Sequence, residues 1–178
     1  MPYITTAELA ERPGAREIAQ QASLPHQMVR DDALMDATLR GTDRSAWTPE
    51  QIAAADAALA RVQDAVAEAG ALIDGHLVQR GYTLPLALPP GSAGRSMVTV
   101  WARSITRYLL NKDRMTDESK DPVARDYRDA LKLLGLLAAG KFSLGADDPA
   151  APAATGSTDV RFDSAPTVFN RTQLHAFR

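Results

Sequence analysis

The segment from Thr48 to about Arg80 most constrains the fold, because its apolar residues recur at every third or fourth position. That spacing matches the turn of an α-helix and places them on one face. Thr48 and Gln51 form a capping-box pattern around Pro49, and Gly81 is expected to end the helix. The sequence therefore predicts a rod of roughly 48 Å, at ~1.5 Å per residue. Its apolar stripe is Ile52, Ala55, Leu59, Val62, Val66, Ala69, Ile73 and Leu77.

Two glycines interrupt the second half of this helix, Gly70 and Gly75. Each costs about 1 kcal/mol relative to alanine in a helix interior. We expect them to mark either a bend or a close crossing with another helix.

Further helices are predicted on both sides of the rod. Cap residues and breakers indicate short helices over 7–12, 15–23 and 31–39. Longer ones are predicted from about 94 to 114 and from 122 to about 139, and Asp121 is the expected cap of the last. The inward residues of the helix over 94–114 are expected to be Val98, Trp101, Ile105 and Tyr108.

The composition supports an all-α fold. Apolar residues make up 45% of the chain, but much of that share is alanine and aromatic residues supply only 6%. Such a mixture favours closely packed helices over a β-sandwich or a large aromatic pocket. The sequence predicts a small helical bundle with one long helix, a proline-rich extended loop and an extended C-terminal arm.

Two parts of the chain are expected to be extended. The segment 82–91 contains three prolines, which remove backbone donors and fix an extended backbone. Its leucines alternate, so we expect it to lie in a groove and to offer a contact to a second subunit. The segment 146–158 has the Pro, Ala, Gly and Ser content of a linker. The leucines of the loop are Leu84, Leu86 and Leu88.

The domain prediction is a helical domain over 1–145, followed by a linker and docking arm over 146–178. The arm carries apolar residues spaced too irregularly for one helical face. Burying such a side chain is worth roughly 1.5–3 kcal/mol, and an isolated arm has nothing against which to bury it. We therefore expect the arm to dock, on this chain or on another. Its predicted contact residues are Phe162, Val168, Phe169, Leu174 and Phe177.

Patterns typical of catalysis or of cofactor binding are not found. The histidines His26, His76 and His175 lie in different segments and do not have metal-ligand spacing. Cysteine is absent, and no serine lies in a nucleophile elbow. We therefore expect no catalytic residues, no metal and no cofactor, and a protein that is not an enzyme.

Net charge and hydropathy limit the partners. The formal charge of −2 argues against binding to nucleic acid by bulk electrostatics. Arg103 and Arg107 share a face of the helix over 94–114, where they could face DNA or pair with Asp126 and Asp129. No signal peptide is recognised and no run approaches the ~20 apolar residues of a membrane span, so we expect a soluble protein without membrane contact.

Several segments in this order resemble the head–tail connector (adaptor, or head-completion) proteins of Mu-like bacteriophages and prophages. None of the segments is a catalytic signature, and it is their order and spacing together that are specific. They are Tyr3-Ile-Thr-Thr-Ala-Glu-Leu9, Ala71-Leu-Ile-Asp-Gly-His-Leu77, Arg80-Gly-Tyr-Thr-Leu-Pro-Leu86, Ala102-Arg-Ser-Ile-Thr-Arg-Tyr-Leu-Leu110, Asp126-Tyr-Arg-Asp-Ala-Leu-Lys-Leu-Leu134, Gly140-Lys-Phe-Ser-Leu144 and Ala165-Pro-Thr-Val-Phe-Asn170.

This resemblance implies a structural protein of the virion neck, made in the host cytoplasm. It implies a ring, of twelve subunits, between the portal protein and the tail-completion proteins, with DNA passing through the lumen as cargo. The arm would then contact the portal or a neighbouring subunit. The alternative is a small DNA-binding packaging or regulatory protein, similar to a terminase small subunit. Duplex-DNA binding over a salt series would discriminate the two.

Overall fold

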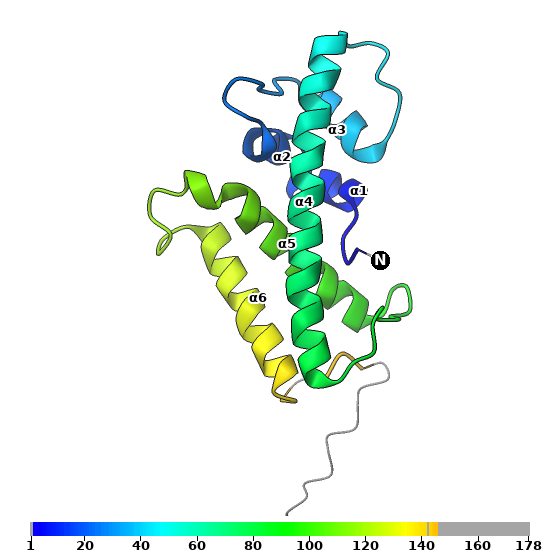
Figure 1. Ribbon diagram of the computed structural model, residues 1–178, viewed down its shortest axis with the longest axis vertical. Helices are drawn as coiled ribbons and strands as arrows, with labels where there is room; N and C mark the ends of the chain where they lie inside the picture. Colours follow the sequence, from blue (N-terminus) through cyan, green and yellow to red (C-terminus); the bar gives the residue numbers. More distant parts are fainter. Residues whose placement is uncertain (1, 142, 146–178) are drawn as a thin grey trace, which may run out of the picture.

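A computed structural model describes residues 2–141 and 143–145 and confirms the all-α prediction. One long helix, α4, runs along the molecule, and α2, α3, α5 and α6 pack on it (Figure 1). Within the described residues no strand is present beyond one isolated bridge. The helices are α1 (Thr6–Leu9), α2 (Ala15–Ala22), α3 (Asp32–Arg40), α4 (Pro49–Arg80), α5 (Ala93–Asn111) and α6 (Pro122–Ala138).

Local sequence signals set both ends of α4. The Thr48 hydroxyl accepts from the Gln51 amide at 3.3 Å, and the Gln51 side chain accepts from the Thr48 amide at 2.9 Å. The predicted capping box is therefore confirmed. Gly81 ends the helix in the left-handed region, at φ +97°, where a side chain would be strained.

The buried face of α4 consists largely of alanines. Ala55 and Ala69 are fully buried, as predicted, and so are Val62, Ile73 and Leu77. The other predicted stripe residues, Ile52, Leu59 and Val66, are only half-buried. Ala58 and Ala65, which were not predicted, are buried on this face instead. Small side chains there allow neighbouring helices to approach the axis of α4 closely.

The glycines of α4 do not mark a close helix crossing. A Cβ atom placed on Gly70 or Gly75 would meet nothing within 4 Å. α4 continues through both positions as one helix of 32 residues. That part of the prediction is wrong, because neither glycine lies against another part of the described chain.

α5 and α6 pack along the C-terminal half of α4 (Figure 1). Val98, Trp101 and Ile105 of α5 are buried, as predicted. Tyr108 is half-buried and stacks on Tyr127 of α6, with ring centroids 3.9 Å apart. α5 also ends earlier than predicted, because a 3₁₀ turn (Lys112–Arg114) follows Asn111.

The N-terminal helices cover the other half of α4 (Figure 1). Thr5 and Glu8 form a capping box at the start of α1, and Asp31 caps α3. The first helix differs from the predicted range 7–12: α1 ends at Leu9 and a π-type segment (Ala10–Gly14) follows. Pro13, which lacks a donor, lies inside that segment and explains the departure from α-helix.

Candidate assembly surface

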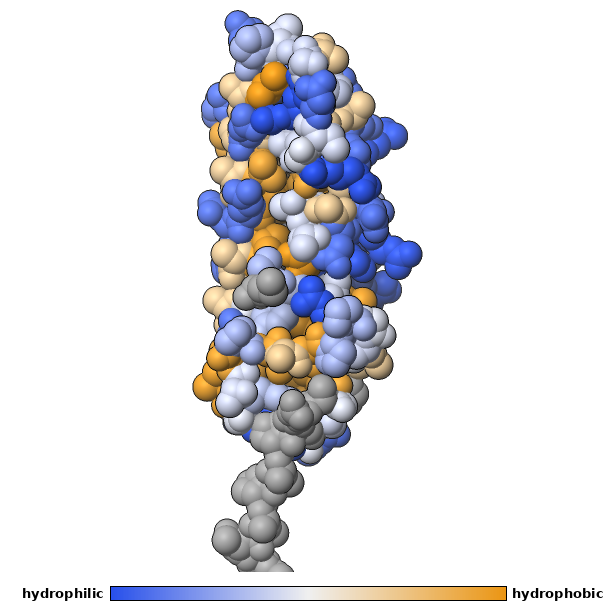
Figure 2. Space-filling view, turned by 90° about the vertical axis from the view of Figure 1, so that its right-hand side faces the viewer, coloured by the Kyte–Doolittle hydropathy of each residue, from blue (hydrophilic) through white to orange (hydrophobic). Residues whose placement is uncertain are grey.

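The proline-rich loop after α4 lies at one end of the molecule (Figure 1). Tyr82 is buried at its start, and Leu86 and Leu88 are half-buried against the core of the same subunit. Leu84, by contrast, is 40% exposed. Of the three predicted contact leucines, Leu84 therefore offers the most apolar surface to another molecule. Figure 2 shows apolar side chains at this end of the molecule and also further along the same face.

The chain that leads to the C-terminal arm is anchored at this same end. Leu144 is buried, and its amide donates to the Tyr82 hydroxyl at 3.5 Å. Its carbonyl lies so close to Gly94 that a Cβ atom there would overlap it. Gly140, at φ +72°, lies beside the guanidinium of Arg80. The contacts of Leu144 with Tyr82 and Gly94 thus place the start of the arm at the same end as the exposed Leu84, and no sequence motif predicts these contacts.

The predicted arm contacts lie outside the described residues. These are Phe162, Val168, Phe169, Leu174 and Phe177. Their docking stays a prediction.

Arg107 is held in a cluster of charges. Its Nε atom donates to Glu17 of α2 at 2.7 Å, and its Nη1 atom lies 3.9 Å from Asp126 of α6. Asp126 was a predicted partner, whereas Glu17 was not. Asp129, the other predicted partner, makes no ion pair within the described part of the chain. Arg107 therefore joins three helices, and its charge is largely balanced inside the subunit.

Arg114 has a role that its sequence does not reveal. Its guanidinium donates to the carbonyls of Gln20 and Ser23, the latter at 2.7 Å. These carbonyls lie at the C-terminal end of α2, where backbone acceptors have no helical donors. A cation there also suits the helix dipole. The contact spans about ninety positions of sequence, which is why helix periodicity did not find it.

Arg103 differs from both of these arginines. Its Nε atom is buried and has no hydrogen-bond partner within the described residues. Burial lowers the pKa of its guanidinium, and the nearby Arg12 lowers it further. Arg103 lines a groove of about 430 Å³ with Arg95, Val100 and Glu8. The geometry suits an anionic group supplied from outside the subunit.

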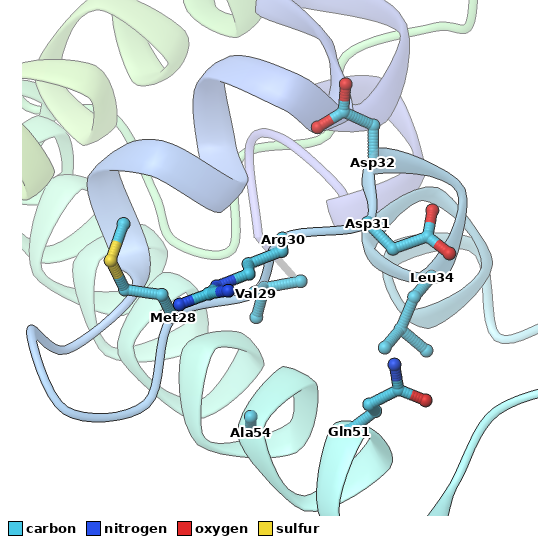
Figure 3. A pocket seen from close by; sticks show the side chains of 8 residues that line it. All are labelled: Met28, Val29, Arg30, Asp31, Asp32, Leu34, Gln51 and Ala54. Carbon is cyan, nitrogen blue, oxygen red and sulfur yellow. The ribbon is translucent and has the colours of Figure 1, made fainter.

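A second hollow, also of about 430 Å³, lies between α3 and the start of α4 (Figure 3). Two acidic residues line it, Asp31 and Asp32, and Asp31 already has structural partners: it accepts from Trp47 Nε1 at 2.6 Å and from the Ala33 amide at 2.9 Å. The hydrogen bond from Trp47 lowers the Asp31 pKa.

Among the described residues no cluster of three or more potential metal ligands is present. Nor does any helix in that part of the chain have the length and apolar character of a membrane span.

Comparisons with known proteins identify the family. A family model described as "Bacteriophage Mu, Gp36" matches residues 3–162, so four of the five predicted arm contacts lie beyond the match. Mu-like prophage FluMu protein gp36 of Haemophilus influenzae is 34% identical over 119 residues, covering 67% of this chain and 75% of that protein. Gene product J of Escherichia phage Mu is 31% identical over 112 residues, covering 62% and 72%. The chain therefore belongs to the bacteriophage Mu Gp36 family and is a protein of the Mu-like phages and prophages.

Proposed function

We propose that this protein is a structural subunit of the phage particle, a head-to-tail connector. In this proposal it forms a ring of twelve copies between the portal protein and the tail-completion proteins, in the virion neck. DNA passes through the lumen, and the subunit itself carries out no chemistry. Membership of a Mu phage family and a helical bundle built around one rigid rod support this assignment.

One observation carries the proposal: the root of the arm and the exposed Leu84 lie at the same end of the bundle. An arm anchored there can engage a neighbouring molecule while the bundle stays rigid. Ordering such an arm costs of order 1 kcal/mol or more per residue, and burial of its apolar side chains on the partner offsets that cost. The portal protein or an adjacent subunit is the proposed acceptor.

Of the two arginines proposed to face the lumen, Arg103 and Arg107, the structure favours one. Arg107 is already paired with Glu17 and Asp126, so it has little charge left to offer to passing DNA. Arg103 has no such partner in the described part of the chain. Of these two arginines, Arg103 is therefore the one that can pair with an anionic group from outside the subunit.

The experiment removes the arm in the phage itself. Deletion of residues 160–178 should leave a folded helical protein but heads that no longer acquire tails. A finer variant replaces Phe162, Phe169 and Phe177 by serine. Its matched control replaces Asn170, Thr172 and Gln173 by serine, which changes the same region without removing apolar surface. Electron microscopy of lysates would count tailed and tailless heads.

The outcomes separate the two functional classes. Loss of tails with the phenylalanine variant alone supports the connector. Infectious particles from the deletion mutant would contradict it. The purified protein would also be titrated with duplex DNA at several salt concentrations. Tight binding with a steep salt slope would favour a packaging or regulatory protein instead.

A further inference from the structure

A groove beside α5 offers the half-buried Arg103 to a partner. The groove is lined by α5, by Glu8 of α1 and by the end of the proline-rich loop. Val100, at its edge, is 50% exposed, although it is a large apolar residue. One turn further along α5, the Arg103 Nε atom is buried without a partner in the described residues. An apolar contact and an unmatched cation thus lie side by side.

The acidic residues of the same subunit do not satisfy this cation. Glu8 and Glu11 are close enough to raise the pKa of Arg103, but among the described residues neither forms an ion pair with it: one oxygen of Glu8 accepts from the amide and hydroxyl of Thr5 at 2.7 and 2.9 Å, and Glu11 pairs with Arg40. Glu17 is bound to Arg107. Arg95 adds a further positive charge to the groove lining. Since a partly buried cation gains from a charged hydrogen-bond partner, a carboxylate from outside is the group that this groove fits.

The outward face of α4 presents such carboxylates on a flat surface. Asp64 and Glu68 are exposed and make no ion pair or hydrogen bond within the part of the chain that the structure describes. Several of the exposed residues of this face are small, which leaves room for a partner side chain. They are Ala53, Ala60, Ala67, Ala71 and Gly75, which recur at helical spacing.

The two surfaces lie on different sides of the molecule. In Figure 1, α4 lies in front of α5, and the helices pack through the buried face of α4. The acidic residues lie opposite the buried residues of α4, so this face points away from the core. On α5, Val100 and Arg103 lie apart from the residues that it buries, such as Val98 and Ile105. Two different patches on one molecule permit a head-to-tail contact, which closes into a ring when the rotation allows it.

We propose that the outward face of α4 in one copy of this chain docks into the α5 groove of the next copy. Arg103 then pairs with Asp64 or Glu68, and Val100 packs on the alanines around Ala67. This inference rests on the proposed function, because it names the contact between neighbouring subunits of the ring. Charge complementarity selects a second copy as the occupant, since the same chain supplies both the unmatched cation and the unmatched acids.

Charge reversal tests the pairing. Arg103→Glu alone, and Asp64→Lys with Glu68→Lys, should each lower the number of copies bound to portal-bearing heads by about tenfold. The triple variant that carries all three changes should recover to within about threefold of the original chain, because the charges are exchanged. Lys132→Glu, an exposed change on α6, is the matched control and should leave assembly unchanged. Circular dichroism of each purified variant would verify the fold.

Cross-linking gives a second readout, and the absence of cysteine in this chain makes it specific. A chain with Val100→Cys and Ala67→Cys, assembled on heads and oxidised, should yield a ladder of covalent multimers. A mixture of the two single-cysteine variants should give covalent dimers but no larger multimers, because each copy then carries only one cysteine.

The two proposals can fail separately. Copies that assemble on heads without cross-linking, and without rescue by charge exchange, would overturn this contact and leave the connector standing. A protein absent from heads altogether would overturn both.

Discussion

Gly94 lies at the start of α5, directly beneath the backbone of Leu144. It is buried, and a Cβ atom there would overlap the Leu144 carbonyl oxygen, which belongs to backbone and cannot rotate away. The close approach therefore requires a residue without a side chain. This single position joins the first turn of α5 to the segment that leads to the arm.

Gly94→Ala should therefore lower the free energy of unfolding by about 1–3 kcal/mol, as for other overpacked sites. Gly75→Ala is the matched control, since a Cβ atom there meets nothing within 4 Å. That change should stabilise the protein by up to about 1 kcal/mol through helix propensity. Urea denaturation of both variants measures the difference, and equal effects would contradict the contact.

Tyr3 ties the N-terminus to α4 through a hydrogen bond from its hydroxyl to Asp74. Burial and this hydrogen bond raise the pKa of the Tyr3 phenol above its usual range. Because the phenol has a higher pKa in the folded protein than in the unfolded chain, its protonated form stabilises the fold. This stabilisation is complete below the unfolded-state pKa, about 10, and is lost as the pH rises further.

Tyr3→Phe should cost about 1.5–3 kcal/mol at pH 7, as expected for a hydrogen bond to a charged group. The difference from the original chain should shrink between pH 9 and pH 11.5, because the variant has no phenol to titrate at this position. Thermal denaturation across this range tests the linkage. A difference that stays constant with pH would show that the hydroxyl contributes only by packing.

At the scale of elements, the short helix α2 depends on side chains from elsewhere in the chain. Its C-terminal carbonyls accept from Arg114, and its Glu17 accepts from Arg107. A helix of eight residues is marginal in isolation, so these distant contacts help to hold it in place.

Arg114→Ala should therefore destabilise the protein by about 1–3 kcal/mol, because the carbonyls of Gln20 and Ser23 lose a charged donor. Lys112→Ala, in the same 3₁₀ turn and exposed, is the control and should cost less than about 0.5 kcal/mol. Hydrogen exchange should show loss of protection concentrated in α2. Protection lost uniformly over the chain would argue against a local role for Arg114.

At the scale of the whole molecule, the buried core extends from Tyr3 to Leu144. Leu144 is 5% exposed and packs where the proline-rich loop meets α5. The core contacts described here thus reach to the very base of the arm.

A chain cut after Gly145 should keep the helix content and the melting temperature of the full protein to within a few degrees. A chain cut after Gly140 should lose about 2–5 kcal/mol, because it lacks the buried Leu144. Circular dichroism melts of the two truncations measure this. A large loss from the first cut would place part of the arm in the core and weaken the docking proposal.

The sequence by itself determined the helices. Caps such as Thr48 with Gln51, the stop at Gly81 and the period of the apolar residues act over a few neighbouring positions, so they can be read directly. The family resemblance was equally visible as a linear order of segments, and the family model confirms that the protein is of Mu-like phages. The buried residues of α4 were predicted only in part, because alanines occur on both its buried and its exposed face.

Only the tertiary structure decided which distant groups meet. Arg107 with Glu17, Arg114 with Ser23 and Gly94 with Leu144 are each separated by fifty or more positions. It also distinguished the exposed Leu84 from its half-buried neighbours and left Arg103 without a partner among the described residues. The physical reason is the range of the interactions: caps and periodicity are local, whereas these contacts depend on the path of the whole chain.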